Sequence, residues 1–244
     1  METMTTSIIL PFLVFFPFLG AVISYIIGRS NKGARDIWCW ILSAVIFIAS
    51  LMLIGKETVY SLRGFCGLGL SFAADGFGVI LAVLTGAIWL ITTIFSKEYM
   101  AAERNRNRYY FFVFLTLGAT MGIFLSADLF TTFIFFEIMS FTSFVLVMHD
   151  EEDFTVRSAK TYLAVAVIGG LVTLMGLFMM YQKAGTLNMA ELTAFMQSRE
   201  NPAEFYAIGV LILFGFAAKA GLFPLHIWLP NAYTVAPAPS SALL

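Results

Sequence analysis

Two ionisable side chains lie deep inside long apolar stretches of this 244-residue chain. Glu137 stands in LFTTFIFFEIMSFTSFVLV, and Lys219 stands in GFAAKAGLFPLHIWLP. Placing a charge near the centre of a bilayer costs roughly 3 kcal/mol or more on insertion scales, so such side chains usually have a partner and a function. Because one is acidic and the other basic, each can be the partner of the other.

Proton exchange is the chemistry that such a pair supports. Burial favours the neutral form of an amine, whereas a nearby carboxylate favours the charged form. At about 4 Å and an effective dielectric constant near 20, the attraction is about 4 kcal/mol, enough to decide whether the amine keeps its proton. Lysine suits this role because, unlike arginine, it can lose its proton. The alternative is a static buried ion pair that only fixes helix packing, although apolar residues often do this equally well.

A proline follows Lys219 after five residues. Pro224 has no N–H to donate to the carbonyl of Ala220, and its ring crowds the same turn, so we expect the helix to break here. Gly215 and Gly221 loosen the region further. Irregular backbone at membrane depth is tolerated where protein or a water-filled cavity satisfies it, so the break predicts access for water.

Other polar residues near these segments are weaker candidates for a part in proton exchange. His226 follows Lys219 by seven residues and could relay protons, since an imidazole titrates near pH 6.5, or could hydrogen-bond at the membrane interface. Ser140, one turn from Glu137, is either its hydrogen-bonding neighbour or a packing residue. We interpret His149 as a solvated loop residue, and we expect Asp128 to be wetted.

Composition excludes several classes of function. Hydrophobic residues make up 60% of the chain and charged residues 12%, which indicates an integral membrane protein. The net charge of -1 gives no basic field for nucleic acid. We interpret Cys39 and Cys66 as packing residues. With no Walker motif, dinucleotide loop, metal-ligand cluster or nucleophile constellation in the sequence, we expect no cofactor and no redox centre, and leave open whether the chain serves an enzyme complex.

Runs of about 20 apolar residues recur along the chain, as membrane-spanning helices require. They predict an all-α polytopic bundle with seven complete spans and the start of an eighth near Pro237. The seven are Ser7 to Gly28, Ile37 to Gly55, Gly76 to Ser96, Tyr109 to Ala127, Leu129 to Met148, Thr161 to Gln182, and Phe205 to about Leu222, the last being the broken one. Because the eighth is only begun, we expect this sequence to be half of something longer.

Basic residues in alternate loops predict the orientation, because Lys and Arg collect on the cytoplasmic side. One set of loops holds nine of them: Arg29, Lys32, Arg35, Lys97, Arg104, Arg106, Arg108, Arg157 and Lys160. The other set holds four: Lys56, Arg63, Lys183 and Arg199. The difference predicts an N-terminus outside the cytoplasm, in a multi-pass protein of the plasma (inner) membrane.

Two outer loops are expected to carry structure. Residues 61–76, SLRGFCGLGLSFAADG, mix glycines with short alternating apolar pieces and predict a small β-hairpin. Asn188 followed by Glu191 predicts the start of a short helix lying on the membrane surface. We interpret both as structural features rather than sites.

The residues with these roles occur together in a known family. The glutamate in FEIMSFTSFVLV, the lysine in AAKAGLFPLHIWLPNAY and the continuation APAPSSALL resemble the antiporter-like, proton-conducting subunits of respiratory complex I, membrane-bound energy-converting hydrogenases and Mrp-type sodium/proton antiporters. The segment GLSFAADGFG is similar to that family as well. The resemblance covers essentially the whole chain and corresponds to the N-terminal half of such a subunit.

The resemblance implies specific roles and an architecture. Glu137 matches the family's fifth-helix glutamate, Lys219 its broken-helix lysine, His226 the histidine before WLP, and Pro224 the breaking proline. Family members contain two inverted five-helix repeats, so residues 1–108 are expected to form an N-terminal three-helix region. Residues 109–244 are expected to form the first proton half-channel repeat, incomplete in this chain.

Three functions follow as expectations. The first is a proton-translocating subunit of a redox-driven complex of the complex I or hydrogenase type, in which Glu137 modulates the proton held by Lys219. The second is a subunit of an Mrp-type Na⁺/H⁺ antiporter, and the third is a non-conducting structural subunit. The expected partners are other membrane subunits together with protons and, in the second case, Na⁺, and no nucleic acid.

Overall fold

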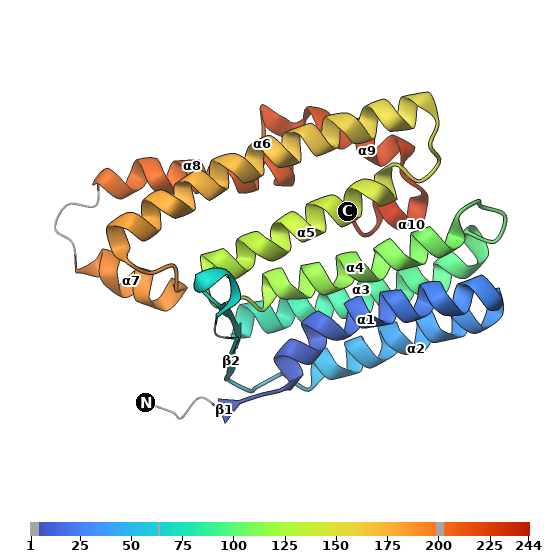
Figure 1. Ribbon diagram of the computed structural model, residues 1–244, viewed down its shortest axis with the longest axis horizontal. Helices are drawn as coiled ribbons and strands as arrows, with labels where there is room; N and C mark the ends of the chain where they lie inside the picture. Colours follow the sequence, from blue (N-terminus) through green and yellow to red (C-terminus); the bar gives the residue numbers. More distant parts are fainter. Residues whose placement is uncertain (1–4, 63, 199–202) are drawn as a thin grey trace.

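The computed structural model of the protein describes residues 5–62, 64–198 and 203–244 (Figure 1). Two arginines that contributed to the predicted orientation, Arg63 and Arg199, lie outside the described residues. The helices are α1 Ile9–Ser30, α2 Lys32–Leu51, α3 Gly76–Tyr99, α4 Arg106–Phe124, α5 Leu129–Val147, α6 Asp153–Ala184, α7 Met189–Gln197, α8 Ala203–Ala220, α9 Trp228–Val235 and α10 Ala238–Ser241. Three strands, β1 Thr5–Thr6, β2 Thr58–Leu62 and β3 Leu70–Ala74, and two 3₁₀ turns, η1 Phe65–Gly67 and η2 Leu225–Ile227, complete it.

Six segments of the described chain are long and apolar enough to cross a membrane. They are Ile9–Ser30, Lys32–Leu51, Gly76–Tyr99, Leu129–Val147, Asp153–Ala184 and Phe205–Val235. The seventh expected span, α4, is a 19-residue helix but is less apolar, because its first turn contains Asn107 and Arg108. Most of α4 from Tyr109 to Gly122 is buried among other helices, so its side chains need not match lipid.

Helix α5 lies between two groups of helices (Figure 1). On one side, a core of buried residues that includes Leu13, Leu42 and Phe114 packs the first four helices against one another and against the sheet. On the other side, residues such as Phe133, Leu177 and Ile208 join α5 to α6, α7 and α8. A third cluster of Val147, Tyr162 and Trp228 joins α5 and α6 to α9. Side chains of α5 therefore face both groups.

The small sheet and α7 lie at the same end of the bundle (Figure 1). Strand β2 pairs antiparallel with β3, with Leu62 opposite Leu70, so the predicted hairpin is confirmed, although its first strand begins earlier, at Thr58. Strand β1 adds a parallel partner that the sequence did not predict. Asn188 starts α7 as expected, because its side chain accepts the backbone N–H groups of Ala190 and Glu191 at 3.0 and 3.2 Å.

Two polar residues expected in water are buried instead. Asp128 caps α5, since its carboxylate accepts the N–H and the hydroxyl of Thr131 at 2.7 and 2.6 Å. His149 follows α5 and is 4% exposed, with its ring 5.8 Å edge-on from that of Tyr109. Burial, helped by the charge of Arg108, lowers the pKa of His149. Both expectations were wrong because α4 and the neighbouring loops cover the two ends of α5.

Glycines bring α6 and α8 into close contact. A Cβ at Gly169 would lie 2.9 Å from that of Ala218, and one at Gly215 would collide with the hydroxyl of Thr173 and the carbonyl of Gly169. Small residues at such crossings let membrane helices approach closely. Lys219, which follows Ala218, is thereby held against α6.

We expect Gly215→Ala to lower the free energy of unfolding by about 1–3 kcal/mol, because the added methyl forces α6 and α8 apart. Gly209→Ala on the same helix is the matched control, since a Cβ there has no atom within 4 Å and alanine favours the helix by up to about 1 kcal/mol. Unfolding midpoints in mixed micelles measure both variants. Equal destabilisation by the two would contradict the proposed close packing.

A candidate proton site around Lys219

Lys219 lies in the last turn of α8, and its amine is surrounded by α5, α6 and α9. The Nζ atom donates a hydrogen bond to Ser143 Oγ at 3.2 Å. It also lies 4.2 Å from the ring centroid of Tyr162 and 6.0 Å from that of Trp228, which is the range of cation–π attraction. The amine therefore has one hydroxyl and two aromatic faces around it.

The helix break that the sequence predicted after Lys219 is present, but a glycine starts it. Gly221 adopts φ +67°, and its N–H and that of Leu222 bond back to the carbonyls of Ala218 and Ala217 at 3.4 and 3.0 Å. This is a Schellman ending, for which glycine is the preferred residue. Pro224 follows three residues later, so the helix has already ended before its missing N–H matters.

The end of helix α8 also favours the positive charge of Lys219. The carbonyl of Ala218 accepts a 2.8 Å hydrogen bond from Trp228 Nε1, so α9 satisfies a backbone group that the end of α8 would leave exposed. Because Lys219 is in the last turn, the negative end of the helix dipole lies close to its amine. The chain thus places a cation where a helix terminus favours one.

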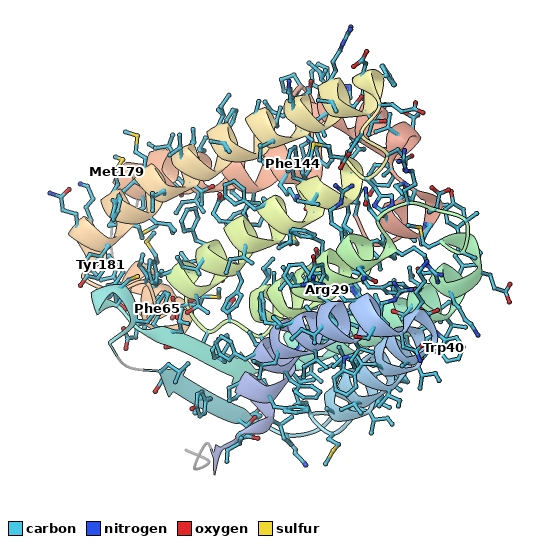
Figure 2. The ribbon with its side chains drawn as sticks, turned by 45° about the vertical axis from the view of Figure 1, so that its right-hand side comes forward. Arg29, Trp40, Phe65, Phe144, Met179 and Tyr181 are labelled. Atoms are coloured by element: carbon cyan, nitrogen blue, oxygen red, sulfur yellow. The ribbon has the colours of Figure 1, made fainter. Side chains whose placement is uncertain are left out.

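Ser143 connects the lysine to α6. Its Oγ lies 2.6 Å from the hydroxyl of Tyr162 and 2.5 Å from the carbonyl of Met139. A serine hydroxyl has one hydrogen to donate and two lone pairs. If Ser143 donates to Met139, it can accept from both Lys219 and Tyr162. Phe144, which Figure 2 shows between α5 and α6, packs beside this cluster.

Glu137 lies on α5 and faces α6. A side chain at Gly170 would collide with its carboxylate, so the glycine provides the space in which that group sits. In the described part of the chain, Glu137 Oε1 is buried without a hydrogen-bond partner. The antiparallel run of α5 and α6 explains why Glu137 meets Gly170 while Ser143 meets Tyr162 further along the same two helices.

The predicted close pair of Glu137 and Lys219 is not formed. None of the ion pairs among the described residues joins them. Lys219 binds Ser143, which is six residues beyond Glu137 and therefore about 9 Å further along the axis of α5. The two charges still attract each other across this gap. Ser140, the other expected neighbour, donates instead to the carbonyl of Phe136 at 2.9 Å.

His226 is not brought to the lysine. It belongs to η2, beyond the break, where its ring is exposed and stacks on that of Phe223 at 5.6 Å. The seven-residue spacing placed it on the same face as Lys219 only for a continuous helix. The turn at Gly221 removes that relation.

Sequence reasoning missed three residues of the site: Ser143, Tyr162 and Gly170. A signal for the first existed, since Ser143 is a hydroxyl residue in the same apolar run as Glu137. Tyr162 and Gly170 carried no comparable signal, because their position depends on how α6 crosses α5. Together these residues form a site that can hold an amine away from bulk water and vary its surroundings by small helix movements.

Known proteins resemble this chain over nearly its whole length. Residues 126–244 match the family described as NADH:quinone oxidoreductase/Mrp antiporter, TM. A curated relative, a subunit of the Na(+)/H(+) antiporter of Bacillus subtilis, is 32% identical over 98% of this chain and 49% of its own length. The chain therefore spans about half the length of the curated relative that it matches.

Two solved structures share the fold with a TM-score of 0.86. One is the membrane-bound sulfane sulfur reductase, an archaeal respiratory membrane complex, at 23% identity over 96% of this chain and 49% of the other. The second is the Mrp complex from a Dietzia species, at 24% identity over 96% of this chain and 26% of the other. This multi-pass membrane protein belongs to the NADH:quinone oxidoreductase/Mrp antiporter transmembrane family, which its residues 126–244 match.

Proposed function

We propose that this chain is an ion-translocating, antiporter-like subunit of a multisubunit membrane complex and that Lys219 carries the proton. The observation that carries the proposal is the amine of Lys219, held by Ser143 and aromatic rings and out of ion-pairing range of Glu137. A static structural pair would be expected to keep its two charges in contact. A separated pair instead leaves room for the distance between the charges to change.

The proposed cycle uses this distance. When Glu137 and Lys219 approach each other, the carboxylate stabilises the protonated amine, and when they separate, burial favours release of the proton. The proton then passes to an acceptor elsewhere in the complex. Pro224 and Gly221 keep the backbone open beside the lysine, and His226 is proposed as a relay on the far side of the break.

The name of the curated relative favours sodium/proton exchange in an Mrp-type assembly. A redox-driven complex is the second candidate, because a respiratory membrane complex shares the fold at a TM-score of 0.86. Genes beside this one would distinguish the two: a run of small antiporter subunits supports exchange, whereas hydrogenase or quinone-oxidoreductase subunits support redox coupling. Other membrane subunits are the proposed partners in both cases.

The proposed topology follows the same family. Helix α4 is counted as a seventh span within the bundle, and the segment from Pro237 as the start of an eighth. Residues 1–108 form the N-terminal three-helix region with its outer hairpin, and residues 109–244 form part of the first of two inverted five-helix repeats. The N-terminus and the sheet face outward from the cytoplasm, across the plasma membrane.

Replacing Lys219 with Met is expected to abolish proton translocation by the assembled complex, because the only proposed proton carrier of the site is lost. Lys219→Arg should also fail, since arginine keeps the charge but does not release its proton. Dye-detected proton flux in proteoliposomes measures both, with Lys160→Met, at an exposed position near the start of α6, as the control. Normal flux in Lys219→Met would favour the non-conducting structural role.

Glu137→Gln should reduce proton flux strongly without preventing assembly, because the amide keeps the shape of the side chain but removes the charge that modulates Lys219. Glu57→Gln, at an exposed position near the outer sheet, provides the matched control. Size-exclusion chromatography of the complex separates a translocation defect from an assembly defect. Unchanged flux would mean that Glu137 does not modulate the lysine.

Two serines on one helix test the geometry of the site. Ser143→Ala removes the hydroxyl that binds Lys219 and should lower the flux several-fold and shift its pH profile, since a hydrogen bond to a charged group contributes about 1.5–3 kcal/mol. Ser140→Ala removes only a bond to its own helix and should leave both unchanged. If the two variants behaved alike, Ser143 would have no special part in holding the proton.

A further inference from the structure

A cavity of about 390 Å³ lies at the end of the bundle opposite the sheet. Its lining residues come from the last turns of α1, the start of α2 and the segment that leads into α4, which meet at this end of the bundle (Figure 1). Figure 2 turns this end forward, and Arg29 there marks the last turn of α1. Five cationic residues line the cavity, namely Lys32, Arg35, Arg104, Arg106 and Arg108, with Glu103 as the acidic lining residue.

Carboxylates neutralise only part of this charge. Asp36 is shared by two arginines, since it lies 2.7 Å from Arg35 and 3.2 Å from Arg106. Arg108 pairs with Glu151. Within the described part of the chain, Lys32 and Arg104 form no ion pair. Positive charge therefore remains in excess among the residues that line the cavity, and Arg104 at its edge also borders a neighbouring cavity lined by Asp150, Glu151 and Glu152.

Two hydrogen-bond donors at the cavity also lack acceptors. The Nε atoms of Arg106 and Arg108 are buried without a partner among the described residues. Buried N–H groups normally have an acceptor, and a charged oxygen is the strongest that a guanidinium can find. Fully buried Arg35 supports the wall, with its guanidinium 4.7 Å from the ring of Tyr110 and bonded to Asn107. A compact group with several anionic oxygens would supply acceptors of this kind.

The surroundings favour a lipid as the source of those oxygens. Tyr25 lines the cavity on its α1 side, and tyrosines of this kind lie at membrane interfaces. An apolar stripe of α1 leads away from it, with Leu19, Val22 and Ile26 at 62%, 47% and 61% exposure. In a membrane protein an acyl chain can cover such a stripe while its headgroup occupies the basic cavity.

We propose that this cavity binds the phosphate headgroup of an anionic glycerophospholipid whose acyl chains lie along α1. Free inorganic phosphate would share the headgroup chemistry but would not need the apolar stripe. An acidic segment of a partner subunit could pair with the same basic residues, but it could not bind while a lipid headgroup occupies the cavity. The site is separate from Lys219 and does not depend on the proposed transport function.

The test uses the purified complex, stripped of lipid in detergent and titrated with dioleoyl-phosphatidylglycerol under native mass spectrometry. Lys32→Gln is combined with Arg104→Gln, because both side chains are exposed and their loss should not disturb folding. The matched control combines Arg157→Gln with Lys160→Gln, which removes the same charge from exposed positions outside the cavity. Phosphatidylcholine and millimolar inorganic phosphate serve as competing ligands.

We expect the cavity variant to weaken binding of the anionic lipid roughly tenfold or more, because it removes two of the basic residues that attract the lipid phosphate. The control should bind as the unaltered protein does, and neither phosphatidylcholine nor phosphate should displace the lipid. Equal binding by both variants would overturn the proposal. Displacement of the lipid by inorganic phosphate would overturn the proposal in favour of a small-anion site. If the cavity variant lost a subunit of the complex but bound the lipid as before, the proposal would be overturned in favour of a protein partner.

Discussion

An amine placed among membrane helices must recover from the protein the interactions that it loses with water. At Lys219 these come from the hydroxyl of Ser143, the face of Tyr162 and the carbonyl end of α8. Each of them constrains the rest of the bundle. Helix α8 has to end beside the lysine, and α6 has to pass close enough for its tyrosine to cover the amine. The glycines between α6 and α8 and the turn at Gly221 therefore serve the same purpose as the polar contacts.

The separation of Glu137 from Lys219 changes how the site can be understood. A contact pair would be rigid, because pulling the charges apart in a medium of low dielectric constant costs several kcal/mol. In this arrangement the amine is held by Ser143, whereas the carboxylate occupies the space beside Gly170. The attraction between them is then a bias that small movements can strengthen or weaken. This is the physical basis on which a neighbouring event could change the occupancy of the proton.

The two ends of the bundle are stabilised by different kinds of interaction. At the end that carries the sheet and α7, backbone groups are satisfied locally through hairpin pairing and the Asn188 cap. At the opposite end, charged side chains pack against one another, and Arg35 is buried at a junction of α1, α2 and α4. Such a junction holds only with compensating anions nearby, which is why Asp36 is shared and why an additional anionic ligand fits there.

Local chemistry decided much of this structure from the sequence alone. Apolar length specified most of the spans, turn residues specified the hairpin, Asn188 specified the start of α7, and Gly221 with Pro224 marked the break beside Lys219. These signals work through backbone sterics and hydrophobicity, which act over a few residues. The hydropathy of α4 was the exception, because its place inside the bundle relaxes the demand for apolar side chains.

Contacts between distant residues were decided by the tertiary structure. Lys219 binds Ser143, which is 76 positions away in the sequence. Glu137 on α5 faces Gly170 on α6. His149 is buried, although its neighbours along the chain suggested a solvated loop residue, and His226 lies exposed beyond the break. The register and crossing of α5, α6 and α8 set all of these positions, and that register depends on side-chain packing summed over whole helices. The sequence therefore determined which charges enter the membrane, and the fold determined what each of them touches.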